Sequence, residues 1–131
     1  MEHLRILLVD DHEVVRSLLR HLLEGERGWE VCGEAADGEE AVERSRALHP
    51  DVVVMDVVMP RRNGFDATRE ILRASPQIPV VITTLYEYPE ILRRAQSAGA
   101  IGCVGKSKTT RLLIPAVKSA IDHQPFFPPL S

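Results

Sequence analysis

Short apolar runs alternate along the chain with stretches in which apolar residues recur at helical spacing. The run over residues 51–56 is β-branched and lacks polar alternation, which is typical of a strand buried on both faces of a parallel sheet. Strands are also predicted at residues 5–9, 29–34, 80–84 and 100–105, and helices over about 12–24, 37–48, 65–74, 89–98 and 110–122. Five strands alternating with five helices predict an α/β fold, a parallel sheet covered on both faces in right-handed crossovers.

Start signals support two of these helices. Asp37, with Glu40 three residues later, forms the pattern of a capping box at the start of the second predicted helix. Pro89 suits the first position of the fourth helix, where its missing N–H leaves no hydrogen bond unmade.

Composition narrows the classes of function. At 131 residues, with 44% apolar and 27% charged residues, the chain fits one globular domain. A net charge of -3 gives no electrostatic footprint for direct nucleic-acid binding or for an anionic membrane, and Arg61-Arg62 and Arg93-Arg94 are interpreted as solvated surface. No signal peptide or membrane-spanning run is present, so a cytoplasmic location is expected.

The two cysteines and the last residues have simple interpretations. Cys32 and Cys103 lie far apart without metal-binding spacing, so both are interpreted as small core residues. Residues 124–131 are proline-rich and hold two of the three phenylalanines. We therefore expect a domain over residues 1–123 and a tail over 124–131, either a linker stub or a short docking segment.

Polar residues follow four of the predicted strands. They are Asp10, Asp11, Asp56, Thr84 and Lys106. Because the carboxyl ends of parallel strands share one edge of the sheet, three carboxylates, a hydroxyl and an ammonium group are predicted to converge there. Clustered carboxylates repel one another, and a hard cation with oxygen ligands and several waters relieves that repulsion, which favours Mg²⁺.

The chain resembles a response regulator receiver domain of two-component signalling over roughly residues 4–123. The opening Asp10–Glu13 and residues 34–38 further resemble receivers that precede a LuxR-type helix-turn-helix domain. The resemblance rests on the sequences Leu8-Val9-Asp10-Asp11-His12-Glu13, Asp56-Val57-Val58-Met59-Pro60, Thr84, Ala98-Gly99-Ala100 and Lys106.

This resemblance implies a flavodoxin-like (βα)5 fold, doubly wound, with strand order 2-1-3-4-5. Asp56 would accept a phosphoryl group from a histidine kinase, with Lys106 pairing with the phosphoryl oxygens and Thr84 bonding them afterwards. A further set is implied for the metal: Asp11, Asp56 and the backbone carbonyl of Val58 would bind Mg²⁺ directly, and Asp10 would act mainly through water.

Thr83 competes with Thr84 for the hydroxyl role. The spacing to Ala98-Gly99-Ala100 selects Thr84, and strand alternation sends Thr83 to the opposite face.

Two departures from the family pattern affect the switch. Cys103 stands where receivers often carry an aromatic residue, and Val58 and Tyr86 stand where side chains usually line the path of the hydrolytic water, which predicts slow autodephosphorylation.

We therefore expect a signalling switch rather than an enzyme, a module that catalyses only its own phosphorylation and dephosphorylation. The expected partners are a histidine kinase and an output target. The output surface is expected to be the face made by the last two helices and the fifth strand, or a homodimer through the first and last helices that forms on phosphorylation. The chain is expected to be a stand-alone receiver or the N-terminal part of a transcription regulator. A pseudo-receiver that binds partners without phosphorylation is the alternative, which only Cys103 leaves open because every charged group of the site is present. A Mg²⁺-dependent phosphohydrolase is more remote, because Val58 stands where its general acid would be.

Overall fold

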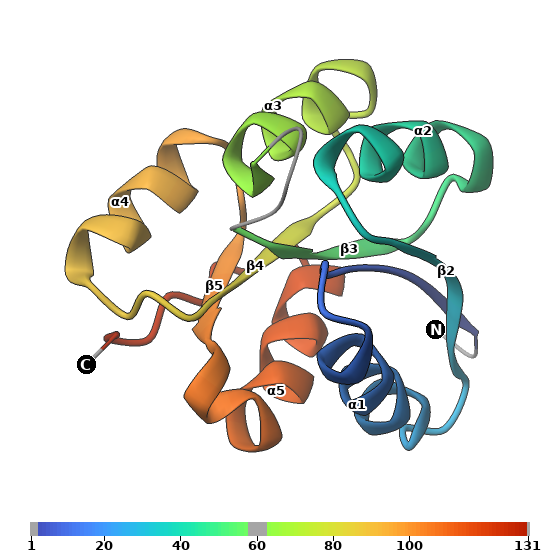
Figure 1. The fold of residues 1–131 in the computed structure, drawn as a ribbon, viewed down its shortest axis with the longest axis horizontal. Coiled ribbons are helices and arrows are strands. Elements are labelled where there is room, and N and C mark those ends of the chain that lie inside the picture. The colour runs from blue at the N-terminus through green and yellow to red at the C-terminus, as the bar shows by residue number, and fades with distance from the viewer. Residues whose placement is uncertain (1–2, 58–62, 131) are drawn as a thin grey trace.

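The computed structural model describes residues 3–57 and 63–130, and Figure 1 shows them as one parallel sheet with helices on both faces. The strands are β1 (Leu4–Val9), β2 (Trp29–Ala35), β3 (Val52–Asp56), β4 (Val80–Thr84) and β5 (Gly102–Gly105). The helices are α1 (Glu13–Glu24), α2 (Gly38–Leu48), α3 (Gly64–Ala74), α4 (Pro89–Ser97) and α5 (Thr109–Ile121), and a 3-10 turn at Lys106–Lys108 leads into α5.

The sheet order is β2-β1-β3-β4-β5, with every pair parallel, so the predicted topology is confirmed. β3 lies at the centre, and all five of its residues are buried, which explains its unbroken apolar sequence. Its last residue, Asp56, lies opposite Thr83 of β4. The chain therefore places this aspartate at the carboxyl edge of the central strand.

The sheet divides the core into two clusters. Alternate strand residues such as Leu8, Val54 and Val81 pack under α1 and α5, whereas Leu7, Met55 and Ile82 pack under α2, α3 and α4. Figure 1 shows these two helix layers on opposite sides of the strands. Among residues 3–57 and 63–130, no helix is long and apolar enough to cross a membrane.

Local signals position the helices as predicted. The Asp37 side chain accepts a hydrogen bond from the Glu40 N–H at 2.8 Å, and the Glu40 carboxylate accepts one from the Ala36 N–H at 2.7 Å. The first of these bonds confirms Asp37 as the cap of α2, while the Glu40 carboxylate bonds the N–H of the residue before the cap. Pro89 occupies the first turn of α4. At the start of α3, a Cβ on Gly64 would lie 2.1 Å from the Asp56 carbonyl oxygen, so only glycine fits beside the end of β3.

The last described residues lie along β5. Phe126 forms a parallel bridge with Gly102, and Leu130 is buried at 3% exposure. In Figure 1 this segment emerges beyond β5, on the side toward α4. The domain boundary at residue 123 stays a prediction, but residues 126–130 contact the domain over both core clusters.

Candidate functional site

Three charged side chains meet at the carboxyl edge of the sheet. Asp10 follows β1, Asp56 ends β3 and Lys106 follows β5. The Lys106 ammonium lies 2.6 Å from the Asp10 carboxylate and 3.1 Å from the Asp56 carboxylate. All three side chains are buried, with 0%, 5% and 8% exposure for Asp10, Asp56 and Lys106. One ammonium group therefore bridges two carboxylates that are otherwise shielded from water.

Burial and mutual repulsion alter the protonation of this cluster. Burial, and then the negative charge of Asp10, raise the pKa of Asp56 to about 6, although the Lys106 ammonium acts in the opposite direction. Burial alone would lower the pKa of Lys106, but its hydrogen bond to Asp10 and the negative charges of both carboxylates raise it above its ordinary value. The site therefore holds a charged lysine and excess negative charge near neutral pH.

A second group of ligand atoms adjoins this bridge. Asp10, Asp11 and His12 each offer one ligand atom, and these atoms all lie within 4.8 Å of one another. The Asp11 Oδ1 atom is buried and has no hydrogen-bond partner in the described part of the chain, while His12 Nδ1 lies 3.1 Å away outside hydrogen-bonding geometry. An orphaned carboxylate oxygen among carboxylates fits a metal ion, and these residues could hold one.

The predicted ligands are only partly brought together by these contacts. Asp10 and Asp11 lie side by side, and Asp56 joins them through Lys106. Val58, whose carbonyl was predicted as a ligand, lies outside the described residues. His12 was not predicted as part of the group, although its position directly after two aspartates was the available signal.

The two threonines at the end of β4 face opposite sides of the sheet. Thr84 is buried, and its hydroxyl accepts a hydrogen bond from the Tyr86 N–H at 2.9 Å and donates one to the Tyr86 carbonyl at 3.2 Å. Thr83 is also buried, but its hydroxyl has no partner among the described residues. Thr84 thus ties the end of β4 to the loop that leads into α4, and its role toward Asp56 stays a prediction.

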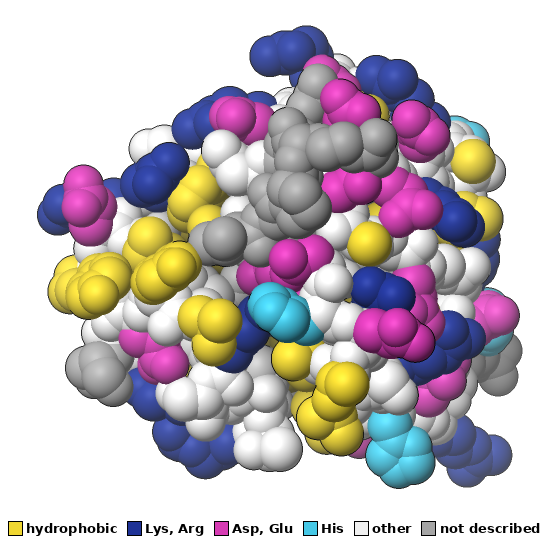
Figure 2. Space-filling view, viewed as in Figure 1, with side chains coloured by type: hydrophobic (Ala, Val, Ile, Leu, Met, Phe, Trp, Pro, Cys, Tyr) yellow, Lys and Arg dark blue, Asp and Glu magenta, His cyan; other side chains and the backbone are white. Residues whose placement is uncertain are grey.

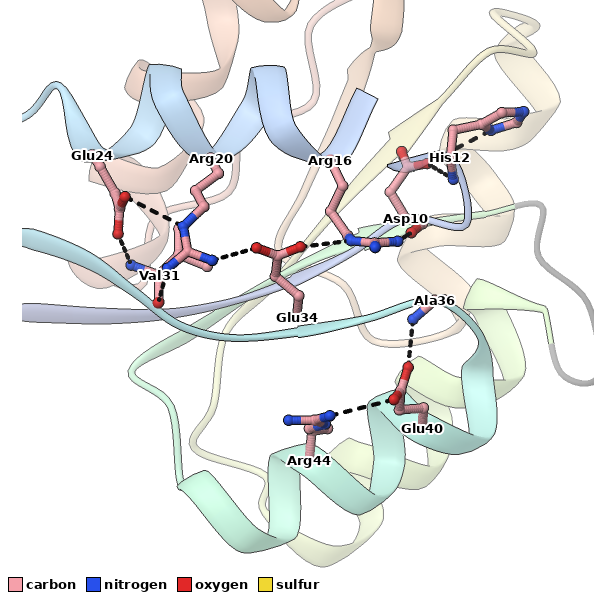
Figure 3. Close-up of polar contacts among 10 residues, drawn as sticks. All are labelled: Asp10, His12, Arg16, Arg20, Glu24, Val31, Glu34, Ala36, Glu40 and Arg44. Atoms are coloured by element: carbon pink, nitrogen blue, oxygen red, sulfur yellow. Dashed lines mark hydrogen bonds and ion pairs between the residues drawn. The ribbon is translucent and has the colours of Figure 1, made fainter. Parts of the chain in front are cut away.

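A network of arginines and glutamates supports the site from behind, as Figure 3 shows. Arg16 of α1 donates one hydrogen bond to the Asp10 carbonyl at 2.7 Å and another to the Glu34 carboxylate at 2.6 Å. Arg20, one helical turn further on, pairs with the other oxygen of Glu34. The network therefore fixes α1 against β2 and holds the backbone of Asp10. Sequence reasoning missed this role, although Glu34 belonged to a motif that carried the family resemblance.

Replacing Glu34 with glutamine tests this network. The two arginines keep the pKa of Glu34 below its ordinary value despite its burial, so its charge stabilises the fold above about pH 4.5 and that contribution is lost as pH falls through the lowered pKa. We expect Glu34→Gln to lower the free energy of unfolding by about 1–3 kcal/mol at pH 7, and by less at pH 4. Urea unfolding at both pH values measures this.

The matched control is Glu30→Gln, which changes a half-exposed carboxylate on the same strand that pairs with His3. A change within about 0.5 kcal/mol is expected there. If both variants lose the same free energy of unfolding at pH 7, the proposed contribution of the Arg16–Glu34–Arg20 network to stability is contradicted.

Comparison with known proteins matches this arrangement to a family. Residues 6–118 match the response regulator receiver domain. The chain belongs to this family. The receiver is 42% identical over 120 residues to the transcriptional regulatory protein PdtaR of Mycobacterium tuberculosis, covering 91% of this chain and 57% of that protein. It is 38% identical over 126 residues to the response regulator GacA of Pseudomonas viridiflava, covering 96% of this chain and 59% of that protein.

Solved structures give the same result. A LuxR-family two-component response regulator from Aurantimonas sp. SI85-9A1 superposes with a TM-score of 0.91 at 36% identity, covering 95% of this chain and 89% of that one. The predicted resemblance to receivers of LuxR-type regulators is therefore confirmed. The receiver spans a little over half the length of the curated relatives it matches.

The surface around the site is apolar in two places. Figure 2 shows hydrophobic side chains gathered over the region between β4 and α4, and others over α1. The exposed members are Val14, Leu18, Leu85, Tyr86 and Tyr88. A groove of about 590 Å³ runs between α1 and the start of α5, and Leu85 and Lys106 both line it. The receiver therefore has an apolar groove that extends to Lys106 of the site.

Proposed function

We propose that this receiver accepts a phosphoryl group from a histidine kinase onto Asp56 and transmits the change through the loop from Leu85 to Tyr88. The observation that carries the proposal is the burial of Asp56 at a strand end, bridged by Lys106 to Asp10. A buried negative pair with one cation is costly for stability alone, and it suits a site that must bind further positive charge and a transferred phosphoryl group.

The proposed metal is Mg²⁺, bound directly by Asp11, Asp56 and the Val58 carbonyl, with Asp10 acting through water. The buried Asp11 Oδ1 atom supports this assignment, because no hydrogen-bond donor among residues 3–57 and 63–130 meets it. When bound, Mg²⁺ would neutralise negative charge on the carboxylates and on the phosphoryl oxygens. Among this chain's own groups, the Lys106 ammonium favours the ionised form of the acceptor, whereas the negative charges of Asp10 and Asp11 raise the pKa of Asp56.

In the transfer, one oxygen of Asp56 forms a bond to phosphorus as the bond from phosphorus to the kinase imidazole nitrogen breaks, and that nitrogen keeps the bonding electron pair. Lys106 lies within 3.1 Å of the acceptor carboxylate, so its ammonium can pair with the incoming phosphoryl oxygens. Phosphoryl transfer depends mainly on positioning and charge neutralisation, which a lysine held by two carboxylates provides.

Thr84 would then carry the signal. Its hydroxyl donates its one proton to the Tyr86 carbonyl in this structure, so a new hydrogen bond to the phosphoryl group would require it to give up that bond to the loop. The loop leads directly into α4, whose first residue is Pro89. Phosphorylation would therefore change the position of the loop and the first turn of α4.

The proposed partners are the kinase and a second copy of the receiver. The apolar groove beside Lys106 is a suitable docking surface for the kinase, because it brings a partner helix to the acceptor. Val14 and Leu18 of α1 are 72% and 66% exposed, which supports a homodimer through α1 and α5 after phosphorylation. The relatives' names support a place in a transcription regulator, and the module itself acts as a switch rather than as an enzyme.

A slow loss of the phosphoryl group is also expected. Tyr86 is 48% exposed and its ring stacks on Tyr88 with 6.5 Å between ring centroids, so a bulky group stands where water would approach. We expect Tyr86→Glu to speed dephosphorylation roughly tenfold, which corresponds to about 1.4 kcal/mol in the barrier. The decay of the phosphorylated mass over time measures this, and Tyr88→Glu is the matched control. Equal rates in parent and Tyr86→Glu would sink the idea.

Intact-mass analysis after incubation with Mg²⁺ and acetyl phosphate tests the main proposal. We expect a gain of one phosphoryl group in the parent and in Asp66→Asn, which alters an exposed carboxylate, and none in Asp56→Asn. A chelator should abolish the gain. A folded parent that binds Mg²⁺ and gains no mass would overturn the proposal and favour a pseudo-receiver.

A further inference from the structure

Phe126 pairs with the outer edge of β5. Its N–H donates a hydrogen bond to the Ile101 carbonyl at 2.9 Å, and its carbonyl accepts one from the Cys103 N–H at 3.0 Å. The intervening residue, Gly102, would bring a Cβ within 3.1 Å of the Phe126 carbonyl oxygen, so the approach of the two backbones is close. The segment Phe126–Leu130, called the strap below, therefore covers an edge that would otherwise expose unpaired backbone groups.

The side chains of the strap reach both halves of the core. Phe126 packs against the cluster under α1 and α5. Phe127 packs against the other cluster, and Leu130 is buried within it at 3% exposure. The strap thus closes the sheet edge on both faces, and its two anchors on the α4 side are apolar.

The direction of the strap brings it toward the site. It is parallel to β5, so it runs from Phe126 toward the carboxyl edge of the sheet. Leu130 shares its cluster with Ile91, in the first turn of α4, and with Cys103 of β5. The Cys103 side chain is small, and the larger side chains of Phe127 and Leu130 fill space in this cluster beside it. A displacement of the first turn of α4 would disturb the seat of Leu130.

The attachment is limited by the sequence of the segment. Pro125, Pro128 and Pro129 have no N–H, so they can donate no hydrogen bond to β5, and the bridge is formed by Phe126. The strap is therefore held by one bridge and a few apolar side chains. Such attachments belong to the least stable parts of a fold and open before the rest.

We propose that the outer edge of β5 and the apolar seat between β5 and α4 form a docking site for an extended segment, which the strap fills while Asp56 is unphosphorylated and leaves on phosphorylation. The inference rests on the proposed function. Release of the strap frees the Cys103 N–H and the Ile101 carbonyl, together with the seat of Leu130. These groups fit a partner segment that adds as a short strand and places apolar side chains beside α4.

Amide hydrogen exchange, followed by NMR on the full chain, tests this directly. Without a phosphodonor, the Cys103 amide should be protected by its bond to Phe126. After incubation with Mg²⁺ and acetyl phosphate, with phosphorylation confirmed by intact mass on the same sample, we expect its exchange to speed up at least about tenfold. The amide of Val53, which bonds the Pro79 carbonyl inside the sheet, should keep its protection. Asp56→Asn should show no change.

A variant pair separates the strap from the phosphorylation step. Leu130→Ser removes a buried anchor and should speed Cys103 exchange without a phosphodonor by roughly tenfold to a hundredfold, whereas Ala74→Ser alters an exposed side chain at the end of α3 and should not. If the parent gains the phosphoryl mass but the protection of the Cys103 amide is unchanged, the proposed release of the strap is overturned and the proposed function is unaffected. No mass gain in a folded parent overturns both. Unchanged exchange in Leu130→Ser shows that the edge is held otherwise and also contradicts the proposal.

Discussion

Replacing Lys106 with methionine is expected to destabilise the receiver by about 3–5 kcal/mol at pH 7 and to abolish phosphorylation. The ammonium group contacts the carboxylates of both Asp10 and Asp56, and all three side chains are buried. Methionine fills a similar volume without charge, so the decrease in the free energy of unfolding reports the cost of leaving two buried carboxylates without their shared cation. The pKa of Asp56 should rise further, because the Lys106 ammonium is one of the groups that lower it.

The pH dependence distinguishes this cause from a packing defect. At pH 4 the Asp56 carboxyl, whose raised pKa rises further without the lysine, is largely protonated in the variant, so the loss should shrink, whereas a packing defect would persist. Added Mg²⁺ should recover part of the stability at pH 7. Lys118→Met is the matched control, since that side chain is 60% exposed and lies 3.4 Å from Glu26. Urea unfolding that gives the same loss for both lysines would contradict this account.

Asp56→Asn is expected to stabilise the receiver at pH 7, by at most roughly 3 kcal/mol, since one pKa unit corresponds to about 1.36 kcal/mol. Burial and the Asp10 charge raise the pKa of Asp56 from 3.8 to about 6. The folded state therefore binds this proton more tightly than the unfolded state does. The parent should lose stability as pH rises from about 4 to 6 and should not regain it above that range, while the variant lacks this loss.

The difference between parent and variant isolates Asp56, because other carboxylates titrate in both proteins. Their free energies of unfolding should agree near pH 4 and separate by pH 7. Mg²⁺ should stabilise the parent more than the variant and so narrow the gap. A parent that becomes more stable than Asp56→Asn as pH rises in the absence of Mg²⁺ would show that the carboxylate supports the fold instead.

Much of the fold was predictable because each element carries a local signal. The buried β3 is an unbroken β-branched run, and the Asp37 cap, which accepts a hydrogen bond from the Glu40 N–H, marks the start of α2. The convergence of Asp10, Asp56 and Lys106 followed from the rule that strand ends share one edge. The strand order came from the family resemblance, since five βα units alone are compatible with more than one order.

Other features depend on contacts between distant segments, for which the sequence holds no spacing rule. Arg16 and Glu34 lie on different elements, and their pairing follows only once α1 packs against β2. The contact of Phe126 with β5 was also not predictable. The proline-rich composition predicts a poorly ordered end, but the edge of β5 has backbone groups that Phe126 can bond. The buried hydroxyl of Thr83, which has no partner in the part of the chain that the structure describes, was also unpredictable, since its environment depends on which side chains surround that position.

The division of the core by the sheet has a consequence for how substitutions in this receiver combine. Thr83 and Thr84 are neighbours in sequence but face different helix layers, so substitutions under α1 and α5 share few contacts with those under α4. Distant substitutions without shared partners have nearly additive effects. Substitutions in one helix layer should therefore leave the stability contributed by the other layer nearly unchanged, and only changes at the carboxyl edge of the sheet, which both layers share, should affect both.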